Sequence, residues 1–183
     1  MKGWAHMTNP EVTTTVALRS LTDMGSADRA AFDATIHPDA NNREAVDEPP
    51  ACRGRGPEAF WQSAVWLRTA FDDLRHEAHA VVAAGDIVVI HATMSGTHSG
   101  PFVTYDENAR VKQAFAPTRR SFAVSHTHWY RMSGGLCIEH WANRDDLGMA
   151  EQLGWIPPTP AYLWRCRRAR RAAQTAHRAS SIN

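Results

Sequence analysis

The chain has 183 residues, which suits one domain of ordinary size with some additional tail. Hydrophobic residues make up 43% and charged residues 21%, a globular composition that excludes a mainly disordered chain. The formal net charge of +1 argues against a general electrostatic role on nucleic acid or on anionic lipid.

Targeting signals and cysteines point to the cytoplasm. No run of about 18 apolar residues occurs, so the sequence predicts no transmembrane helix. The N-terminal residues include one early lysine but no continuous apolar stretch, so we expect no secretory signal. Cys52, Cys137 and Cys166 are odd in number and far apart, and we interpret them as free thiols in a reducing compartment.

Two helices are predicted in the first part of the chain. Residues 1–25 are weakly patterned and indicate a loose lead-in or a short helix. Ser26 offers an N-cap for a helix over 27–36, and the Asp-, Asn-, Pro- and Gly-rich stretch that follows is typical of a loop. A second helix opens at Gly56-Pro57, because proline fits the first helical position. Its apolar face is formed by Phe60, Ala64, Leu67, Phe71 and Leu74.

After His76 the apolar period changes to that of strands. The predicted strands cover 78–82, 87–93, 121–132 and 136–141. Gly85-Asp86 connects the first two as a hairpin. A last short helix begins at Asp145 or Asp146 and ends at Gly154.

This order of elements predicts an α+β fold rather than a doubly wound one. The helices come first and tight turns join neighbouring strands, so the sheet is expected to be mostly antiparallel. We predict a lead-in over 1–25, one main domain over 26–156, and a helical basic tail over 157–183. Tyr162, Leu163 and Trp164 are expected to pack on the domain while the arginines stay solvated, which we favour over nucleic-acid binding.

Three common catalytic motifs are absent. Gly54-Arg55-Gly56 lacks the Gly-Lys-Ser that completes a phosphate-binding loop. The chain contains neither a His-Glu-x-x-His zinc helix nor a Gly-x-Ser-x-Gly nucleophile turn. The sequence therefore contains no motif that would indicate a nucleotide-binding enzyme or a serine hydrolase.

Histidines gather in strands that otherwise look half-buried. His126 and His128 are two residues apart in one strand, so their side chains share a face. If that face is concave, an apolar cup with a few convergent polar groups results, the usual form of a small-molecule site. Each histidine could instead be a hydrogen-bonded structural residue. His140 and Trp141 point to opposite faces, so at most one of them faces the pocket.

Four segments carry a resemblance to a known family. They are His37–Asp39, Leu67–Glu77, the stretch GDIVVIHATMSGTHSGPF from Gly85, and YRMSGGLCIEHWANRDDLGMAEQLGW from Tyr130. Together they resemble the SnoaL-like polyketide cyclases, or ester cyclases, which share the fold of nuclear transport factor and ketosteroid isomerase. The resemblance implies a curved antiparallel sheet wrapped by helices into a cone with an internal pocket, without a metal or an organic cofactor.

The resemblance also implies roles for individual residues. Asp145, just after the Glu-His-Trp strand, corresponds to the general acid/base, and His128 to the partner of the substrate carbonyl. A carboxylate within hydrogen-bond reach can remove the proton beside a carbonyl and return it to the new alkoxide. The alternative for Asp145 is a helix N-cap, which would fall to Asp146 if Asp145 is free. The candidate pocket-lining residues are His91, His98, His126, Trp66 and Trp141.

The expected partner is a small hydrophobic compound that contains a carbonyl group. A non-catalytic binding domain of the same fold and an epoxide-hydrolase-like enzyme remain alternatives, although adjacent strand residues Asn143 to Asp145 cannot all face one pocket. The segment 101–117 is longer than in the resembling family and predicts extended strands or a lid. A homodimer through the exposed face of the sheet is a further expectation.

Overall fold

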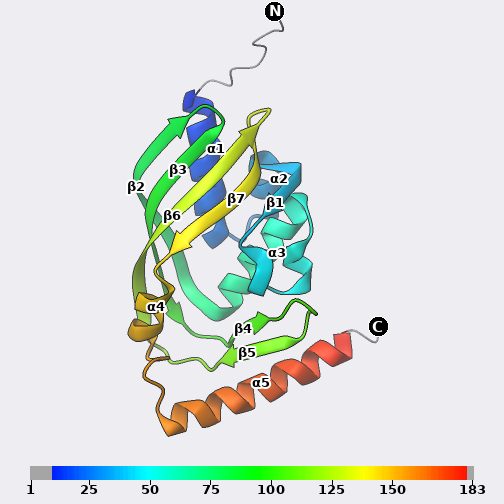
Figure 1. Ribbon diagram of the computed structural model, residues 1–183, viewed down its shortest axis with the longest axis vertical. Helices are drawn as coiled ribbons and strands as arrows, with labels where there is room; N and C mark the ends of the chain where they lie inside the picture. Colours follow the sequence, from blue (N-terminus) through cyan, green and yellow to red (C-terminus); the bar gives the residue numbers. More distant parts are fainter. Residues whose placement is uncertain (1–9, 181–183) are drawn as a thin grey trace, which may run out of the picture.

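The computed structural model describes residues 10–180, and residues 1–9 and 181–183 lie outside that range. Figure 1 shows a curved sheet with helices α1, α2 and α3 on one side, while the β4–β5 hairpin and α5 lie beyond one end of it. The helices are α1 (Pro10–Thr22), α2 (Arg29–Thr35), α3 (Gly56–Ala70), α4 (Asp146–Leu153) and α5 (Pro160–Ser180). Three short 3-10 turns are η1 (Asp23–Gly25), η2 (Ala45–Asp47) and η3 (Pro50–Arg53).

The main sheet has five strands in the order β1-β7-β6-β3-β2. Their bounds are β1 (Ile36–Asn42), β2 (Phe71–Ala84), β3 (Ile87–His98), β6 (Ser121–Ser133) and β7 (Leu136–Arg144). Only the β1–β7 pair is parallel, and the other neighbours are antiparallel. The predicted α+β fold with a mostly antiparallel sheet is therefore confirmed.

Local differences from the prediction have tertiary causes. Residues 36–42 form β1 rather than a loop, because pairing with β7 supplies hydrogen bonds to a segment that has no apolar alternation. The second helix ends at Ala70, whose carbonyl oxygen accepts from the backbone N–H groups of Ser99 and Gly100. The chain then continues directly into β2, so Phe71 and Leu74 lie in a strand.

The N-terminal helices also begin differently from the prediction. Of the two expectations for residues 1–25, the described part shows a helix, α1, and its Ala17 and Leu21 are buried in the core. The N-cap of α2 is Asp28, whose side chain accepts from the backbone N–H of Ala30, rather than Ser26. The Ser26 hydroxyl instead accepts from the backbone N–H of Asp28, so it supports the turn before the helix.

The core divides into two clusters that lie along the sheet. One contains Leu21 of α1, Phe32 of α2 and Tyr130 of β6. The other contains Phe71 at the start of β2 and Trp155 just after α4. Burial of this apolar surface, at about 25 cal/mol per Å², is what holds the helices against the sheet.

The long segment after β3 forms a hairpin of β4 (Phe102–Tyr105) and β5 (Val111–Phe115). Trp155 stacks on Phe102 and Phe115, with ring centroids 5.7 and 4.1 Å apart. The hairpin is a separate two-stranded sheet at one end of the main sheet, so the segment does not extend the main strands, which was one of its two expected forms.

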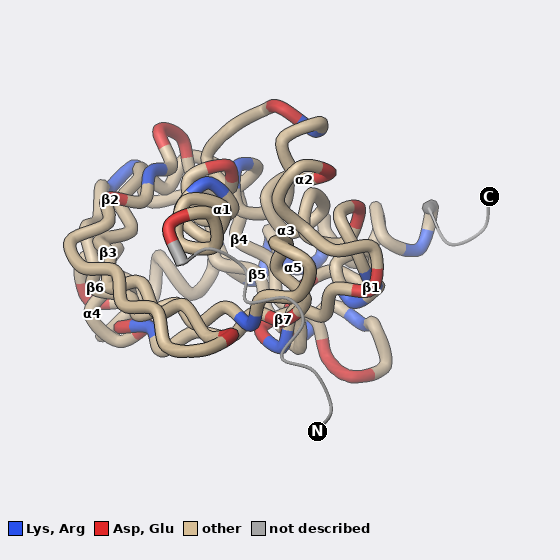
Figure 2. Tube along the Cα trace, turned by 90° about the horizontal axis from the view of Figure 1, so that it is seen from above, with Lys and Arg blue, Asp and Glu red and all other residues tan. Residues whose placement is uncertain are grey.

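Helix α5 runs under the hairpin (Figure 1). Tyr162 is buried in the second cluster, whereas Trp164 is 58% exposed. Tyr162 therefore packs on the domain as predicted, whereas Trp164 does not. Basic and acidic residues are interspersed around the outside of the described fold before α5 (Figure 2), whereas α5 itself contains arginines and no acidic residue. Among the described helices, none is long and apolar enough to cross a membrane.

Candidate functional site: a histidine-lined cavity

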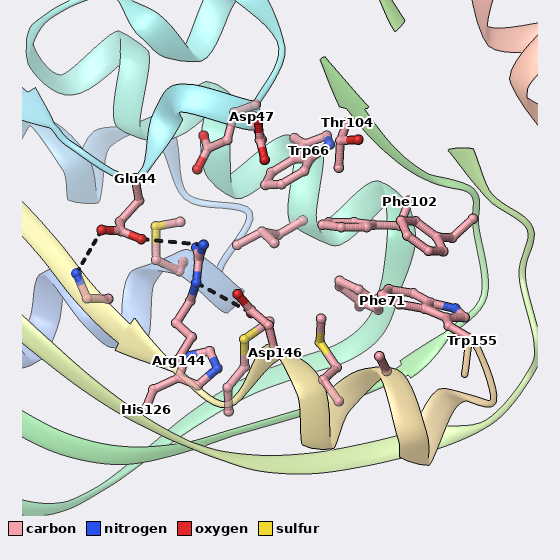
Figure 3. Close-up of a pocket in the computed structure, with 18 of the residues that line it drawn as sticks. Glu44, Asp47, Trp66, Phe71, Phe102, Thr104, His126, Arg144, Asp146 and Trp155 are labelled. Atoms are coloured by element: carbon pink, nitrogen blue, oxygen red, sulfur yellow. Dashed lines mark hydrogen bonds and ion pairs between the residues drawn. The ribbon is translucent and has the colours of Figure 1, made fainter. Parts of the chain in front are cut away.

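A cavity of about 560 Å³ lies between the sheet, α3, α4 and the β4–β5 hairpin (Figure 3). Aromatic side chains line much of it, among them Phe71, Trp66 and Phe102. The indole N–H of Trp66 donates to the backbone oxygen of Val103 at 2.8 Å, which ties α3 to β4. A largely apolar cavity of this size with a few polar groups is suited to a small organic molecule.

Four histidines meet on the sheet side of this cavity: His76 of β2, His126 and His128 of β6, and His140 of β7. The ring centroids of His126 and His128 are 5.5 Å apart. His76 lies 6.5 Å from His126 and 5.7 Å from His128 by the same measure. The predicted common face of His126 and His128 is therefore the concave one.

Hydrogen bonds determine which nitrogen of His128 carries its proton. The backbone N–H of Glu44 donates to Asn42 at 3.2 Å, so the atom of Asn42 at that position must be the oxygen Oδ1. His140 Nδ1 lies 2.9 Å from the same Oδ1 and must donate to it. His140 Nε2 is then the acceptor for His128 Nδ1 at 3.0 Å. In the neutral cluster, His128 Nε2 consequently carries only a lone pair.

The cluster is neutral near pH 7. Burial lowers the pKa of His76 to about 4 and that of His140 to about 3. Burial first, and then the neighbouring His76, lowers the pKa of His126 to about 3. The pKa of His128 lies well below its ordinary value for the same first reason, with His140 adding to the effect.

Acidic side chains surround the other end of the cavity. Arg144 Nη2 lies 3.4 Å from Glu44 Oε2, and Arg144 Nε lies 3.5 Å from Asp146 Oδ1 (Figure 3). Glu44 Oε1 also accepts from the backbone N–H of Ala142. These contacts orient Asp146 and Glu44 beside the cavity.

A further carboxyl group, that of Glu48, is buried in the cavity wall. It is 5% exposed and accepts a hydrogen bond from the hydroxyl of Ser63. Burial raises the pKa of Glu48 above its ordinary value, and the bond from Ser63 opposes that rise. Sequence reasoning missed Glu48 because it lies in a segment without periodicity.

Asp145 does not line the cavity in this structure, which corrects its expected position. Its Oδ1 accepts from the backbone N–H of Gly148 at 2.8 Å, so it is the N-cap of α4. A Cβ atom at residue 148 would collide with the Asp145 carboxylate, so glycine there permits the cap. Asp146, the alternative cap, instead faces the cavity. The charge of Asp145 still reaches His126, whose pKa it raises against the larger effect of burial.

Three other predicted pocket residues lie elsewhere. His91 is exposed and its Nε2 lies 2.9 Å from the Ser125 hydroxyl, on the outer face of the sheet. Trp141 stacks on Trp129 on that same outer side, so His140 is the member of its pair that faces inward. His98 is fully buried, but its Nδ1 accepts from the backbone N–H of Thr118 at 3.3 Å, outside the cavity lining.

The cavity also contains two histidines that were not predicted as site residues. His76 was assigned to the end of a helix, and only the early start of β2 brings it to the sheet. For His140, the alternation rule left the choice between it and Trp141 open. The sequence signal that could have found both residues is the repeated occurrence of histidine in otherwise apolar strand segments, because histidine is buried less often than the apolar residues.

A family model described as SnoaL-like polyketide cyclase matches residues 15–153. This match covers more than half of the chain, including the sheet, the histidine cluster and α4. The chain belongs to the SnoaL-like polyketide cyclase family. The resemblance inferred from the four sequence segments is thereby confirmed.

Relatives of this SnoaL-like protein agree with the assignment. It is 31% identical over 126 residues to the aklanonic acid methyl ester cyclase DnrD of Streptomyces peucetius, which covers 68% of this chain and 79% of that protein. Among solved structures, TsrD from Streptomyces laurentii is similar with a TM-score of 0.65 and 22% identity, over 80% of this chain and 98% of that one. An NTF2-like protein from Burkholderia thailandensis has a TM-score of 0.52 and 20% identity, over 77% and 96%. These structures establish the cone fold.

Proposed function

We propose that this SnoaL-like protein catalyses ring closure of a small polyketide-like carbonyl compound by acid/base chemistry inside the cavity. The observation that carries the proposal is the pairing of a carboxylate, Asp146, with a cluster of inward histidines in one largely apolar cavity. The cyclase relative at 31% identity supports the reaction class. The substrate is a small hydrophobic molecule whose oxygen atoms lie against the histidines.

Ring closure of this kind is an intramolecular aldol step. The base removes a proton from the carbon beside a carbonyl, and the resulting enolate carbon attacks a second carbonyl carbon of the same molecule. One carbon–carbon bond forms, the second carbonyl becomes an alkoxide, and the protonated base returns its proton to that oxygen. A single carboxylate performs both transfers, and no oxidant or reductant is consumed.

Asp146 is the carboxylate that we assign to this role in place of Asp145. It lines the cavity, whereas Asp145 is occupied by the N–H of Gly148. Arg144 holds Asp146 in position. The family resemblance implies His128 as the partner of the substrate oxygen, but its Nε2 carries only a lone pair in the neutral cluster. We therefore propose that the neighbouring His126, whose two unpartnered ring nitrogens include one N–H, donates to that oxygen, with His128 and His76 beside it.

The first experiment compares two neighbouring aspartates. Turnover of an aromatic polyketide methyl ester with an uncyclised side chain is followed by absorbance and chromatography. Asp146→Asn should lower kcat by about a hundredfold or more, because a general acid/base is lost. Asp145→Asn should change kcat only a few-fold, because asparagine is an equally good N-cap.

The reverse pattern would return the acid/base role to Asp145 and overturn our assignment. Equal turnover by all three proteins would exclude both carboxylates. Ligand binding without turnover by the wild type would favour the non-catalytic binding domain.

We further propose that the protein acts in the cytoplasm and as a homodimer. The three cysteines are free, which fits a reducing compartment. The stacked Trp129 and Trp141 on the outer side of the sheet supply aromatic surface of the kind enriched at interfaces. Light scattering of the purified chain measures the mass directly, and a monomer at micromolar concentration would contradict the dimer.

A further inference from the structure

Three imidazoles converge in the cavity, and each has at least one ring nitrogen without a hydrogen-bond partner among the described residues. His76 Nδ1, both nitrogens of His126 and His128 Nε2 are buried and have no hydrogen-bond partner among the described residues. One nitrogen from each of His76, His126 and His128 lies within 4.8 Å of the others. Because an unpaired buried polar atom costs about 1–3 kcal/mol, a group of them in one place indicates a missing ligand.

The hydrogen-bond chain described above decides what kind of ligand fits. His128 Nε2 presents a lone pair, because Asn42 and His140 hold its proton on Nδ1. A bare nitrogen cannot donate to a substrate carbonyl oxygen, so it repels that atom rather than binding it. The lone pair suits a proton or a metal cation.

We propose that His76, His126 and His128 bind one divalent transition-metal ion, of the Zn²⁺ type, inside the cavity. Zinc with imidazole nitrogens at 2.0–2.1 Å has ligand atoms about 3.4 Å apart, so modest side-chain rotations close the observed triangle. Three histidines leave the fourth position of the ion open toward the cavity, as in catalytic zinc sites.

The strands are arranged to hold such a site. His126 and His128 alternate on β6 and so project from one face. His76 reaches them across β3, where Met94 is paired with His76 and Ala92 with His126. The methyl group of Ala92 is short enough to leave the three rings free to approach one another.

The surroundings of the cluster resemble those of known metal sites. A metal-binding histidine usually donates its other ring N–H to an acceptor that fixes its orientation, and the contact from His128 to His140 is of this form. The cavity lining contains four carboxyl groups, Glu44, Asp47, Glu48 and Asp146, against one arginine, Arg144. That arginine disfavours positive charge at His126 and His128, but it is paired with Glu44 and Asp146, and the carboxyl groups of the lining outnumber it.

The ion's role in catalysis rests on the proposed function, but its binding does not. A bound cation would polarise the carbonyl oxygen of the substrate and stabilise the enolate that forms when Asp146 removes a proton. It would therefore supply the positive partner that the neutral histidines cannot.

The test is metal binding by the full chain, measured without substrate. After treatment with a chelator, the protein is titrated with Zn²⁺ by calorimetry and with Co²⁺ by visible absorption. We expect one ion per chain and cobalt bands typical of four-coordinate nitrogen and oxygen ligands. His126→Gln and His128→Gln should each weaken Zn²⁺ binding by about a hundredfold or more, since one of three ligands is lost.

His91→Gln is the matched control, because His91 lies on the outer face of the sheet. Its affinity for Zn²⁺ should equal that of the wild type. Absence of stoichiometric binding, or binding that His126→Gln and His128→Gln leave unchanged, would overturn the proposal. Turnover by metal-free protein at the full rate would remove the catalytic role alone, whereas Zn²⁺ binding by a protein that closes no ring would overturn the cyclisation and leave the site standing.

Discussion

At the residue scale, two histidines show that the surroundings of a buried ring, rather than burial alone, decide its role. His98 and His128 both lie in strands and are almost completely buried. The Nδ1 atom of His98 is occupied by the backbone N–H of Thr118, and its ring packs 5.2 Å from that of Trp155. Each ring keeps its Nε2 without a hydrogen-bond partner among the described residues, but only His128 lines the cavity. His98 is therefore a structural residue.

The structural role of His98 predicts a dependence of stability on pH. Burial lowers its pKa from 6.5 to about 4, so the unfolded chain binds a proton at this position before the folded chain does. The stabilising contribution is complete above pH 6.5 and is lost as the pH falls toward 4. For this one group the loss is at most about 1.4 kcal/mol per pH unit.

His98→Gln, which keeps an acceptor for Thr118, isolates this effect from that of the other histidines. Urea unfolding of both proteins between pH 7 and pH 5 should show a shallower decline for the variant. Parallel declines would mean that His98 is charged in the folded protein.

At the element scale, helix α3 begins at a backbone position that only glycine occupies without strain. Gly56 has a φ of 75°, and an added Cβ atom would also collide with the carbonyl oxygen of Pro38 in β1. The close approach lets β1 lie between α3 and β7, and β1 is the strand that supplies Asn42 to the histidine chain. Gly56 therefore contributes to the site indirectly, because it lets α3 approach the strand that carries Asn42.

Gly56→Ala should therefore lower the free energy of unfolding by about 3 kcal/mol or more, the sum of backbone strain and steric displacement. Gly85→Ala is the matched control. Gly85 has a similar φ of 62° in the β2–β3 turn, but nothing lies within 4 Å of its added Cβ atom. That variant should lose only about 1 kcal/mol, from the backbone alone. Equal losses in chemical denaturation would show that the contact with Pro38 adjusts without cost.

At the scale of the whole molecule, the C-terminal segment is part of the cavity rather than a detached tail. Tyr162 and Cys166 of α5 line the cavity and belong to or pack against the second core cluster. The helix packs on β5 and so backs the hairpin that carries Phe102 and Phe115. Closure of the cone at this end depends on elements beyond the predicted main domain.

Tyr162→Ala should lower the free energy of unfolding by about 3 kcal/mol, because a large buried side chain leaves a void. It should also weaken binding of an aromatic ligand to the cavity. Trp164→Ala is the comparison, because Trp164 is 58% exposed and does not line the cavity, so its truncation should cost less than about 1 kcal/mol. Thermal unfolding and fluorescence titration measure the two effects, and identical behaviour of the variants would show that α5 does not close the cavity.

The sequence by itself determined the class of fold and the strand geometry of the site. Period-two alternation placed His126 and His128 on one face, and proline and glycine signals located the start of α3 and the β2–β3 turn. These features are local, because side-chain direction along a strand and the preference of a turn depend on neighbouring residues only. The cone shape and its internal pocket were predicted from the four segments that resemble the SnoaL-like family.

Only the tertiary structure decided which residues meet. Pairing of β1 with β7 brings Asn42 to His140, although these residues lie 98 positions apart in the chain. The order β6-β3-β2 brings His76 to His128, and the choice of Asp145 as the cap turned Asp146 toward the cavity. Such contacts depend on long-range strand pairing and on the dihedral angles of one helix start. Neither leaves a periodic pattern in the sequence, because each is selected by the packing of the whole domain.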